Sequence, residues 1–265
     1  MLTLDGIKTA WNNPSAPVMV SIPYTPTAAE EESSESIVVW YIDTQGNIIT
    51  IPNGYYMQST GAVSFSTTHF SDFAVAINQV RFQDVSDGAW YNRAVSFIAA
   101  REITIGTGNG NFGPNSSLTR GQAITLIMKT YGIAPVTNPM DNFSDAGNTW
   151  YTGYLAAAKR LGISIGVGKN LFAPLKEVTR QEMFTLLYNA LGVIKQLPLD
   201  AIYSSRTLSD FIDADQIDSW AKEAMTLLVE MGVVNGYAGM LMPHSTTTRV
   251  EMAQLLYNLM TADRR

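Results

Sequence analysis

The chain has 265 residues, 46% of them hydrophobic, which is enough for one large domain or two smaller ones with a real core. Cysteine is absent, and this excludes disulfides, cysteine–zinc sites and thiol catalysis. The net charge of −6 falls within residues 1–80 and the remainder is balanced, so neither part has the basic excess of a nucleic-acid-binding protein.

Residues 1–80 are predicted to form β structure. Short strands with alternating or β-branched residues are expected at 17–24, 37–42, 48–51, 63–66 and 73–77, with a hairpin turn at 43–47. Residues 28–36 are expected to be a solvated loop or one helical turn. A sheet this small is only marginally stable by itself. We therefore expect a small sandwich-like module that ends a larger β domain or packs on the residues after it.

No apolar run approaches the ~20 residues that a membrane-spanning helix needs. The N-terminus also lacks the basic and apolar regions of a signal peptide. Met1 is therefore expected to begin a fragment of a longer chain, or an intracellular one.

One pattern occurs three times after residue 80. Each copy has Phe-x-Asp, a Trp, a helical stretch, a Gly, an aromatic or apolar residue before x-Pro, and Thr-Arg-x-Glu/Gln. The step from Trp to Gly is 16 residues in all three copies, and the step from Pro to Thr is five. Two spacings held over three copies indicate a repeat architecture, with repeats at 81–136, 141–195 and 208–262.

Each repeat is predicted to be a helix–loop–helix unit. Apolar residues recur with helical periodicity after each Trp and again after each Thr. One such unit cannot bury its apolar faces alone, so the three are expected to pack into one all-α bundle over 81–262. Residues 137–140 and 196–207 are expected to be connectors.

The Thr-x-x-Glu/Gln pairs are capping boxes, predicted for Thr119/Gln122, Thr179/Glu182 and Thr248/Glu251. The arginine inside each motif then lies at the first helical position, where the helix dipole disfavours a cation. Two explanations stay open for Arg120, Arg180 and Arg249. One is an ion pair with an aspartate of the Phe-x-Asp motif; the other is capture of an anion by the guanidinium beside free helix N-terminal amides.

The other repeated residues have a structural and a ligand-binding interpretation. Core packing is the first expectation, and sugar stacking the second, for Trp90, Trp150 and Trp220. A positive φ, or close approach of a ligand to the backbone, is expected at Gly106, Gly166 and Gly236. Helix capping or pairing with an arginine is expected for Asp84, Asp145 and Asp213.

Signals of catalysis or metal binding are weak. The glycine-rich stretch 106–110 follows a predicted helix and lacks the lysine of a P-loop. The aspartates between 210 and 218 lack the glycine and terminal glutamate of an EF-hand, and His69 and His244 have no evident partner. We therefore expect no enzyme activity, no metal and no cofactor.

With these residues assembled, residues 81–262 resemble the S-layer homology domain family. The first copy departs from the family pattern at Gly121 and Gln122, and the third at Leu241. The resemblance implies a pseudo-threefold helical bundle with grooves between repeats, which attaches bacterial surface proteins to wall polysaccharide carrying ketal-linked pyruvate. It implies that the three arginines hold the pyruvate carboxylate, and that the repeated Trp and Gly residues line the sugar site.

Residues 22–26, 37–42 and 67–71 also resemble a β module that often precedes such repeats in large secreted proteins. The resemblance thus implies an extracellular anchoring module at the bacterial cell wall, the C-terminal piece of a longer protein. Two alternatives remain. One is a self-assembling module whose arginines form interface ion pairs, and the other is the anchor of a glycan hydrolase whose catalytic domain lies upstream.

Overall fold

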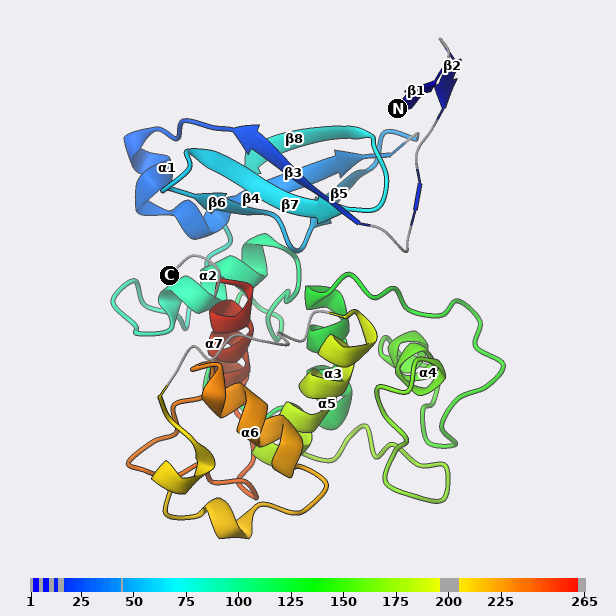
Figure 1. Cartoon of the computed structure of the whole chain (residues 1–265), viewed down its shortest axis with the longest axis vertical. Helices are drawn as coiled ribbons and strands as arrows, with labels where there is room; N and C mark the ends of the chain where they lie inside the picture. Colours follow the sequence, from blue (N-terminus) through cyan, green and yellow to red (C-terminus); the bar gives the residue numbers. More distant parts are fainter. Residues whose placement is uncertain are drawn as a thin grey trace. The chain divides into compact units, whose positions relative to one another are not determined.

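The computed structural model describes residues 2–4, 7–9, 12–13, 17–43, 45–195 and 205–261. The protein is mixed α and β, with strands in its N-terminal part and helices in the rest (Figure 1). Its residues divide into two compact units, Met1–Phe112 and Gly113–Asp263. This division falls between the two helices of the first repeat, so the domain limits expected from the repeat pattern stay a prediction.

The first unit contains two three-stranded antiparallel sheets. One has the order β3 (Val18–Pro23), β7 (Ala62–Thr67) and β6 (Tyr55–Met57), and the other β5 (Ile48–Ile51), β4 (Ile37–Ile42) and β8 (Asp72–Ile77). A separate hairpin joins β1 (Leu2–Leu4) to β2 (Ile7–Thr9). The five expected strands and the β4–β5 hairpin are confirmed. The sequence does not predict β6, because three residues are too few to show alternation.

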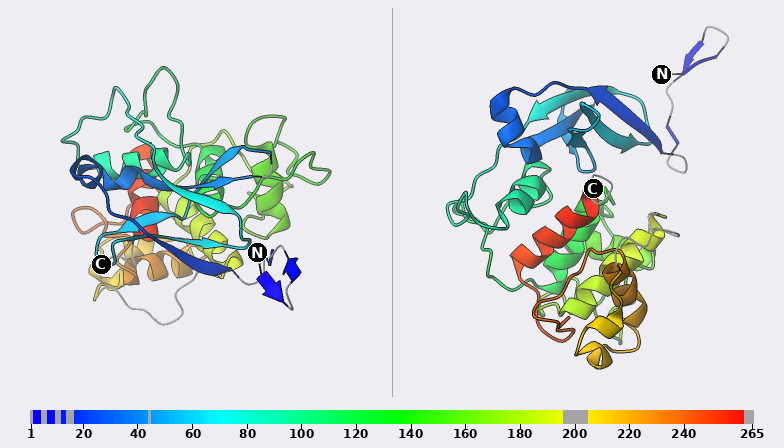
Figure 2. Two further views of the ribbon diagram at one scale, coloured as in Figure 1. Left: turned by 90° about the horizontal axis from the view of Figure 1, so that it is seen from above. Right: turned by 60° about the vertical axis from the view of Figure 1, so that its left-hand side comes forward.

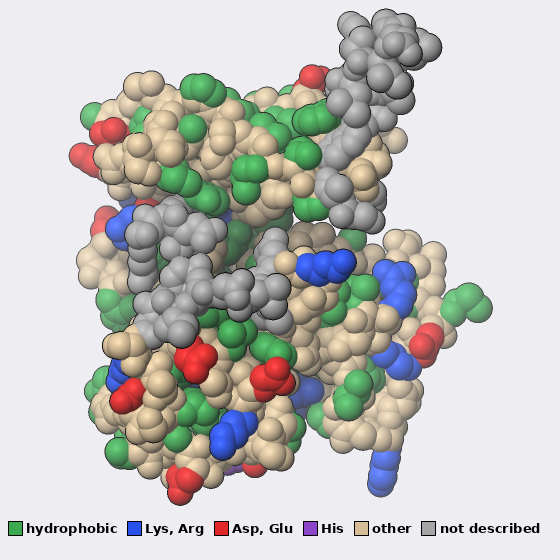
Figure 3. All heavy atoms as spheres, in the orientation of Figure 1, with side chains coloured by type: hydrophobic (Ala, Val, Ile, Leu, Met, Phe, Trp, Pro, Cys, Tyr) green, Lys and Arg blue, Asp and Glu red, His purple; other side chains and the backbone are tan. Residues whose placement is uncertain are grey.

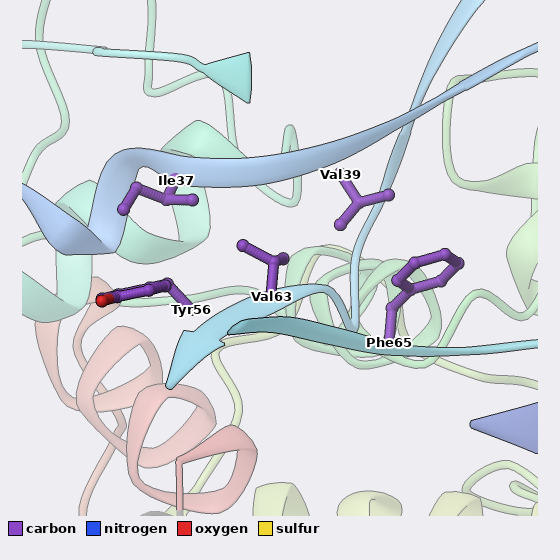
Figure 4. Close-up of a cluster of buried hydrophobic side chains, with 5 residues drawn as sticks. All are labelled: Ile37, Val39, Tyr56, Val63 and Phe65. Carbon is purple, nitrogen blue, oxygen red and sulfur yellow. The ribbon is translucent and has the colours of Figure 1, made fainter. Parts of the chain in front are cut away.

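The two sheets share one apolar core. Ile37 and Val39 of β4 point toward Tyr56, Val63 and Phe65 of β6 and β7 (Figure 4). All five side chains are buried, and apolar residues of β3 and β8 pack around them. Ahead of β4 the expected helical turn is present as α1 (Ala28–Glu32) and the short 3₁₀-helix η1 (Ser34–Ser36).

The first helix of the first repeat, α2 (Asn92–Ala100), is fastened to these strands within the same unit. Arg101, at the end of α2, is only 2% exposed. Its guanidinium donates five hydrogen bonds of 2.8–3.1 Å to backbone carbonyls of Gly54, Glu35, Ile37 and Phe97. One buried side chain from the helical repeat thus donates to carbonyl groups of the strand-bearing segment and of its own helix.

The second unit contains the helices α3 (Arg120–Thr130), α4 (Thr152–Arg160), α5 (Arg180–Val193), α6 (Lys222–Glu230) and α7 (Arg249–Met260). The 3₁₀-helices η2 (Leu208–Asp210) and η3 (Ala214–Gln216) precede α6. α3 packs against α4, α5 and α7, and α5 packs against α6 (Figures 1 and 2). The predicted helix–loop–helix pattern is confirmed, while 196–204 of the expected connector lie outside the described residues.

The backbones of the three repeats meet just before their second helices. The Leu118 N–H donates to the Thr247 carbonyl, the Val178 N–H to Leu118 and the Thr247 N–H to Val178, at 2.8–3.0 Å. Each residue directly precedes a capping threonine, and all three are fully buried. The three hydrogen bonds close a ring, so each repeat contacts both of the others at this point. Among the described residues, no helix is sufficiently long and apolar to cross a membrane.

We predict that replacing Arg101 with methionine lowers the free energy of unfolding by about 3 kcal/mol, since several buried carbonyls would lose their donors. Denaturant unfolding followed by circular dichroism measures this difference. Arg160→Met is the matched control, because Arg160 ends α4 in the second repeat and is exposed. Equal unfolding curves for both variants would show that Arg101 does not hold α2 to the strands.

Candidate functional site

Each second helix begins with the predicted capping box. The side chains of Thr119, Thr179 and Thr248 accept from the backbone N–H three residues on, and Gln122, Glu182 and Glu251 accept in return from the threonine N–H. The three capping boxes are therefore confirmed. They fix where each helix starts, and so place the following arginine at the first helical position.

The amides next to these arginines are not available for a ligand. The Arg120 and Gly121 N–H groups donate to carbonyls of Lys176 and Pro174 in the next repeat, at 2.8 and 2.9 Å. The same two positions of α5 donate to Ser245 and Pro243, and those of α7 donate to Ser116 and Pro114. The expectation of free N-terminal amides is wrong, because the neighbouring loop already supplies their acceptors.

The arginine side chains hold the next repeat as well. Arg120 is 4% exposed; its Nε–H donates to the Phe172 carbonyl at 2.8 Å and its Nη1 lies 2.9 Å from Glu182 Oε1. Arg180 is 9% exposed; its Nε–H donates to the Leu241 carbonyl and its Nη1 to Glu251 Oε1, both at 2.7 Å. Arg249 is buried to a similar degree, at 6% exposed. Arg120 and Arg180 thus act as clamps between successive repeats.

The glutamate of each capping box divides its two oxygens between two tasks. In Glu182, Oε2 accepts from the Thr179 N–H at 2.9 Å, while Oε1 faces Arg120. Glu251 does the same with Thr248 and Arg180. A capping interpretation uses only one carboxylate oxygen, and the unused oxygen beside a recurring arginine is the signal that could have identified the pairing. Gln122 completes its cap too, but its second terminal atom is a nitrogen, which cannot accept from a guanidinium.

Burial and pairing act in opposite directions on these ionisable groups. Burial lowers the pKa of Arg120 below its ordinary value, although the charges of Glu182 and Asp145 oppose the shift. Burial also lowers the pKa of Arg180, against the charges of Glu251 and Asp213. Burial alone would raise the pKa of Glu182. The Thr179 amide, Arg120 and Lys176 together outweigh burial and hold this pKa below its usual 4.5.

One edge of each clamp guanidinium remains without a protein partner. Within the described part of the chain, neither the Nη2 of Arg120 nor that of Arg180 donates to a protein acceptor, because only Nε and Nη1 are used. Each Nη2 carries two N–H donors. These donors can therefore bond to water or to an anionic ligand.

The aspartates of the Phe-x-Asp motif hold a loop through its backbone N–H groups. Within the described residues, neither Asp145 nor Asp213 forms a salt bridge with an arginine or caps a helix through its side chain. Asp145 accepts from the Phe172 and Ala173 N–H groups at 2.8 and 2.7 Å, and Asp213 accepts from Leu241 and Met242 at 2.9 and 2.7 Å. Asp84 accepts from the Phe112 N–H at 2.7 Å. These carboxylates fix the loop whose carbonyl receives the arginine, so they position the clamp.

The repeated glycines have the predicted positive φ, at +81° for Gly106 and Gly166 and +64° for Gly236. The space beside them is filled by the protein itself. A Cβ at Gly166 would overlap the Leu171 carbonyl oxygen and press on the Phe143 ring. Gly106 and Gly236 have the equivalent carbonyl and phenylalanine neighbours. Glycine is therefore required at these three positions because a loop of the chain itself packs closely against them.

The tryptophans lie on the surface and not in the core. Trp90, Trp150 and Trp220 are 68%, 60% and 53% exposed, and each precedes its helix instead of standing on the buried stripe. Core packing, the first expectation for them, is wrong, because the turn before the helix carries the indole outside. Trp90 and Trp150 are steadied by edge-to-face contact with Tyr91 and Tyr151. All three retain an open face.

Tyr151 connects a tryptophan to a clamp. A Cβ at Gly121, the residue after Arg120, would lie 3.2 Å from Tyr151 Cδ1 and 3.1 Å from the Pro174 carbonyl oxygen. Trp150 of the second repeat therefore lies close to the arginine-bearing helix end of the first. The side chains over one such junction come from two repeats.

The next junction has different chemistry at the same position. Gln181, after Arg180, is 3% exposed and its Nε2 donates to Asp218 Oδ2 at 2.7 Å. Its Oε1 accepts from the Asp218 N–H, and its Nε2 lies 3.2 Å from Nδ1 of His244. The third repeat has Ala221 where the second has the large Tyr151, whose ring leaves room only for a glycine at position 121. None of the residues in the Gln181–Asp218–His244 network was singled out as a site from the sequence.

Charge on the surface is mixed. On the face that Figure 3 shows, acidic and basic side chains of the helical part are interspersed and do not gather into one patch. No group of three or more potential metal ligands occurs among the described residues. The repeats share a buried arginine at the start of the second helix and an exposed tryptophan just before the first.

Comparison with known proteins agrees with the repeat pattern. Residues 81–124, 142–184 and 210–253 each match the S-layer homology domain. The chain is 28% identical over 226 residues to amylopullulanase of Thermoanaerobacterium thermosulfurigenes, covering 84% of this chain and 12% of that protein. It is 27% identical over 235 residues to exoglucanase XynX of Acetivibrio thermocellus, with 88% and 20% covered.

A third relative is S-layer protein EA1 of Bacillus anthracis, 25% identical over 175 residues, which covers 66% of this chain and 19% of that protein. The two enzyme alignments cover more of the chain than residues 81–262 can supply, so they extend into the β-rich segment. The chain spans a fifth or less of the length of these three relatives.

The Glu182 clamp predicts a pH dependence. Its folded-state pKa lies below 4.5, so the carboxylate stabilises the protein at neutral pH, and this contribution is lost as the pH falls below 4.5 through the folded pKa. Glu182→Gln keeps an oxygen for the cap but removes the charge facing Arg120. We expect it to lower the free energy of unfolding at pH 7 by about 1–2 kcal/mol, with a difference that shrinks in acid.

Urea unfolding across the pH range measures this difference, and the exposed Glu177, replaced by glutamine, is the control. A gap between Glu182→Gln and wild type that stays constant from neutral pH to acid would contradict the assignment.

The glycine geometry gives a second stability test with a matched pair. Gly162 and Gly166 both have positive φ, +74° and +81°, but a Cβ at Gly162 meets nothing within 4 Å. Gly162→Ala should therefore cost only the left-handed strain, about 1 kcal/mol, and Gly166→Ala about 3 kcal/mol or more because the loop must also move. Thermal and urea unfolding compare the two. Equal losses would mean that the 171 carbonyl does not pack on Gly166.

Proposed function

Because this chain belongs to the S-layer homology domain family, we propose that it anchors a larger bacterial surface protein to wall polysaccharide without a covalent bond. Membership of the family places the chain at the bacterial cell wall and surface. The relatives named as hydrolases are several times longer than the part that matches here. This size difference supports a chain that attaches other domains to the wall and is not itself an enzyme.

The observation that carries the proposal is the free edge of the clamp arginines. Arg120 and Arg180 each present Nη2 without a protein acceptor within the described residues, in surroundings where they are at least nine-tenths buried. A carboxylate that reaches Nη2 forms a charge-assisted hydrogen bond, which is stronger where water is partly excluded. The ligand we propose is wall polysaccharide bearing an acidic substituent, namely ketal-linked pyruvate.

The exposed indoles supply the second half of the proposed site. A tryptophan face offers a flat apolar surface to the C–H face of a sugar ring. Trp150 is tied through Tyr151 to the helix end that carries Arg120, so one ligand that meets both would lie between two repeats. Trp90, Trp220, Gly106, Gly236, Asp84 and Arg249 occupy the corresponding places in the other copies.

We also propose that the repeats form a pseudo-threefold bundle and that the N-terminal sheets form a small sandwich. The closed ring through Leu118, Val178 and Thr247 supports the first, and the core shared by the two sheets supports the second. A bundle of this kind presents similar grooves between its repeats. Simultaneous occupation of several grooves on one polymer gives avidity beyond the affinity of any single groove.

Self-assembly is the alternative suggested by relatives that are S-layer proteins. Its version with arginines as interface ion pairs has less support, since Arg120 and Arg180 pair with glutamates of their own chain. Concentration-dependent assembly in the absence of polysaccharide would favour it.

The indoles provide the cleanest test, because exposed side chains can be replaced without disturbing the clamps. We predict that the triple variant Trp90→Ala, Trp150→Ala and Trp220→Ala binds purified walls at least ~10-fold more weakly, with an unchanged circular dichroism spectrum. Met140→Ala, at a fully exposed apolar residue, is the control. Sedimentation with walls measures the bound fraction. Full binding by the triple variant would reject the proposed site.

The same assay applies to walls whose pyruvate has been removed chemically. A comparable loss of wild-type binding is expected if the guanidinium edges receive the pyruvate carboxylate. Unchanged binding to these walls would reject the acidic ligand while leaving wall anchoring intact.

A further inference from the structure

The first unit contains a cavity that the repeat junctions do not use. Its volume is about 640 Å³, and its walls come from α1 and η1, from α2, and from the segment 79–87 that leads from β8 toward α2. Every lining residue lies within Met1–Phe112. The cavity is large enough for a ligand of two or three sugar units, since small-molecule sites typically measure ~300–1,000 Å³.

The walls of the cavity are held in place by the contacts that join α2 to the strands. Arg101 binds the carbonyls of Glu35 and Ile37, on either side of Ser36. Arg93 of α2 bonds the buried Glu35 carboxylate, with its Nε 2.8 Å from Oε1. Asn78 donates from its side chain to the Ala100 carbonyl at 2.7 Å. The cavity is therefore formed before any ligand arrives, which reduces the entropic cost of binding.

Two hydroxyls that line it have no hydrogen-bond partner in the described part of the chain. Ser36 is 4% exposed, and Ser96 projects from α2; neither Oγ is matched by a donor or acceptor of the protein. Other serines and threonines of the chain do use their hydroxyls in this way, as Ser33 does with the Ala29 carbonyl and Thr130 with Leu126. Both hydroxyls line the cavity, so the pair can donate to or accept from a polar occupant.

The remaining lining defines the chemistry of that occupant. Glu32 and Asp87 contribute two carboxylates and Arg81 a single guanidinium, and the described residues supply no salt-bridge partner to any of them. An excess of acid over base disfavours a phosphate-rich or polyanionic ligand. Phe82, Val85 and Val95, with Ala29 and Val80, add apolar surface, but the charged and polar side chains around them do not suit a lipid or another wholly apolar molecule.

Carboxylates and serine hydroxyls beside a small apolar wall suit a ligand with many hydroxyls and an apolar C–H face. From this lining we infer that the cavity between η1 and α2 binds a short, largely neutral saccharide as a second carbohydrate site. The carboxylates accept from sugar hydroxyls, and Ser36 and Ser96 donate or accept as the hydroxyl pattern requires. That the saccharide belongs to the wall polymer rests on the proposed function; the cavity itself does not use the clamp arginines or the indoles.

The test monitors the methyl signals of valines at the cavity by NMR on the full chain. Di-N-acetylchitobiose and cellobiose are the saccharide probes, and alanylalanine is the peptide probe. We expect at least one saccharide to shift the Val85 and Val95 methyls saturably, with a dissociation constant on the order of 1–10 mM. Asp87→Ala should weaken that binding about tenfold, and Ser36→Ala about threefold to tenfold. Asp215→Ala, at an exposed aspartate of the second unit, should leave it unchanged.

The Ser36→Ala variant loses no hydrogen bond within the protein and is expected to fold normally. It therefore still tests the cavity if the Asp87→Ala variant fails to fold. Saccharide shifts that persist in the triple tryptophan variant would support the cavity even if wall anchoring failed. The inference is overturned if neither saccharide shifts these methyls up to about 100 mM, if both cavity variants bind as wild type does, or if only alanylalanine binds.

Discussion

The pairing of one repeat's arginine with the next repeat's glutamate is the interaction on which the helical part of this protein depends. A guanidinium at the first turn of a helix is poorly placed on its own, since the helix dipole opposes it. Here the side chains of Arg120 and Arg180 extend away from their own helices and pair with Glu182 and Glu251. The second oxygen of each glutamate accepts from the threonine N–H in a capping box. One carboxylate therefore starts a helix and binds the preceding repeat. Removing either partner of such a buried pair leaves a charge without compensation, which is far more costly than the pair's net contribution.

The clamp explains why the motifs occur together. Phe-x-Asp places a carboxylate that holds the Phe-x-Pro loop by two amides, and the loop carbonyl at 172 or 241 then receives the arginine Nε–H. The glycine before the loop has to lack a side chain because that loop folds back against it. Motifs that are far apart along the chain are thus parts of one joint between repeats, and the fixed spacings result from the geometry of the joint.

The proposed ligand site uses the donors that the joint leaves unused. Three of the five guanidinium donors of Arg120 serve structure, while the two on Nη2 have no protein acceptor within the described residues. The structural and the ligand-binding interpretations of the arginines are therefore compatible. The β-rich segment adds a further element, because Arg101 makes α2 part of the same body as the strands and frames a polar cavity between them.

The repeats, the helix–loop–helix units, the capping boxes and most of the strands could be predicted from the order of the residues, because periodicity, cap residues and turn residues act over a few neighbouring positions. The positive φ of Gly106, Gly166 and Gly236 was predictable for the same reason. The exposure of the tryptophans and the partners of the arginines at the helix starts could not be predicted. Folding put Trp90, Trp150 and Trp220 outside and paired Arg120 with Glu182, not with an aspartate. Such choices depend on which loop of another repeat lies within reach, and partners 52 to 71 positions apart leave no mark of their proximity in a single sequence.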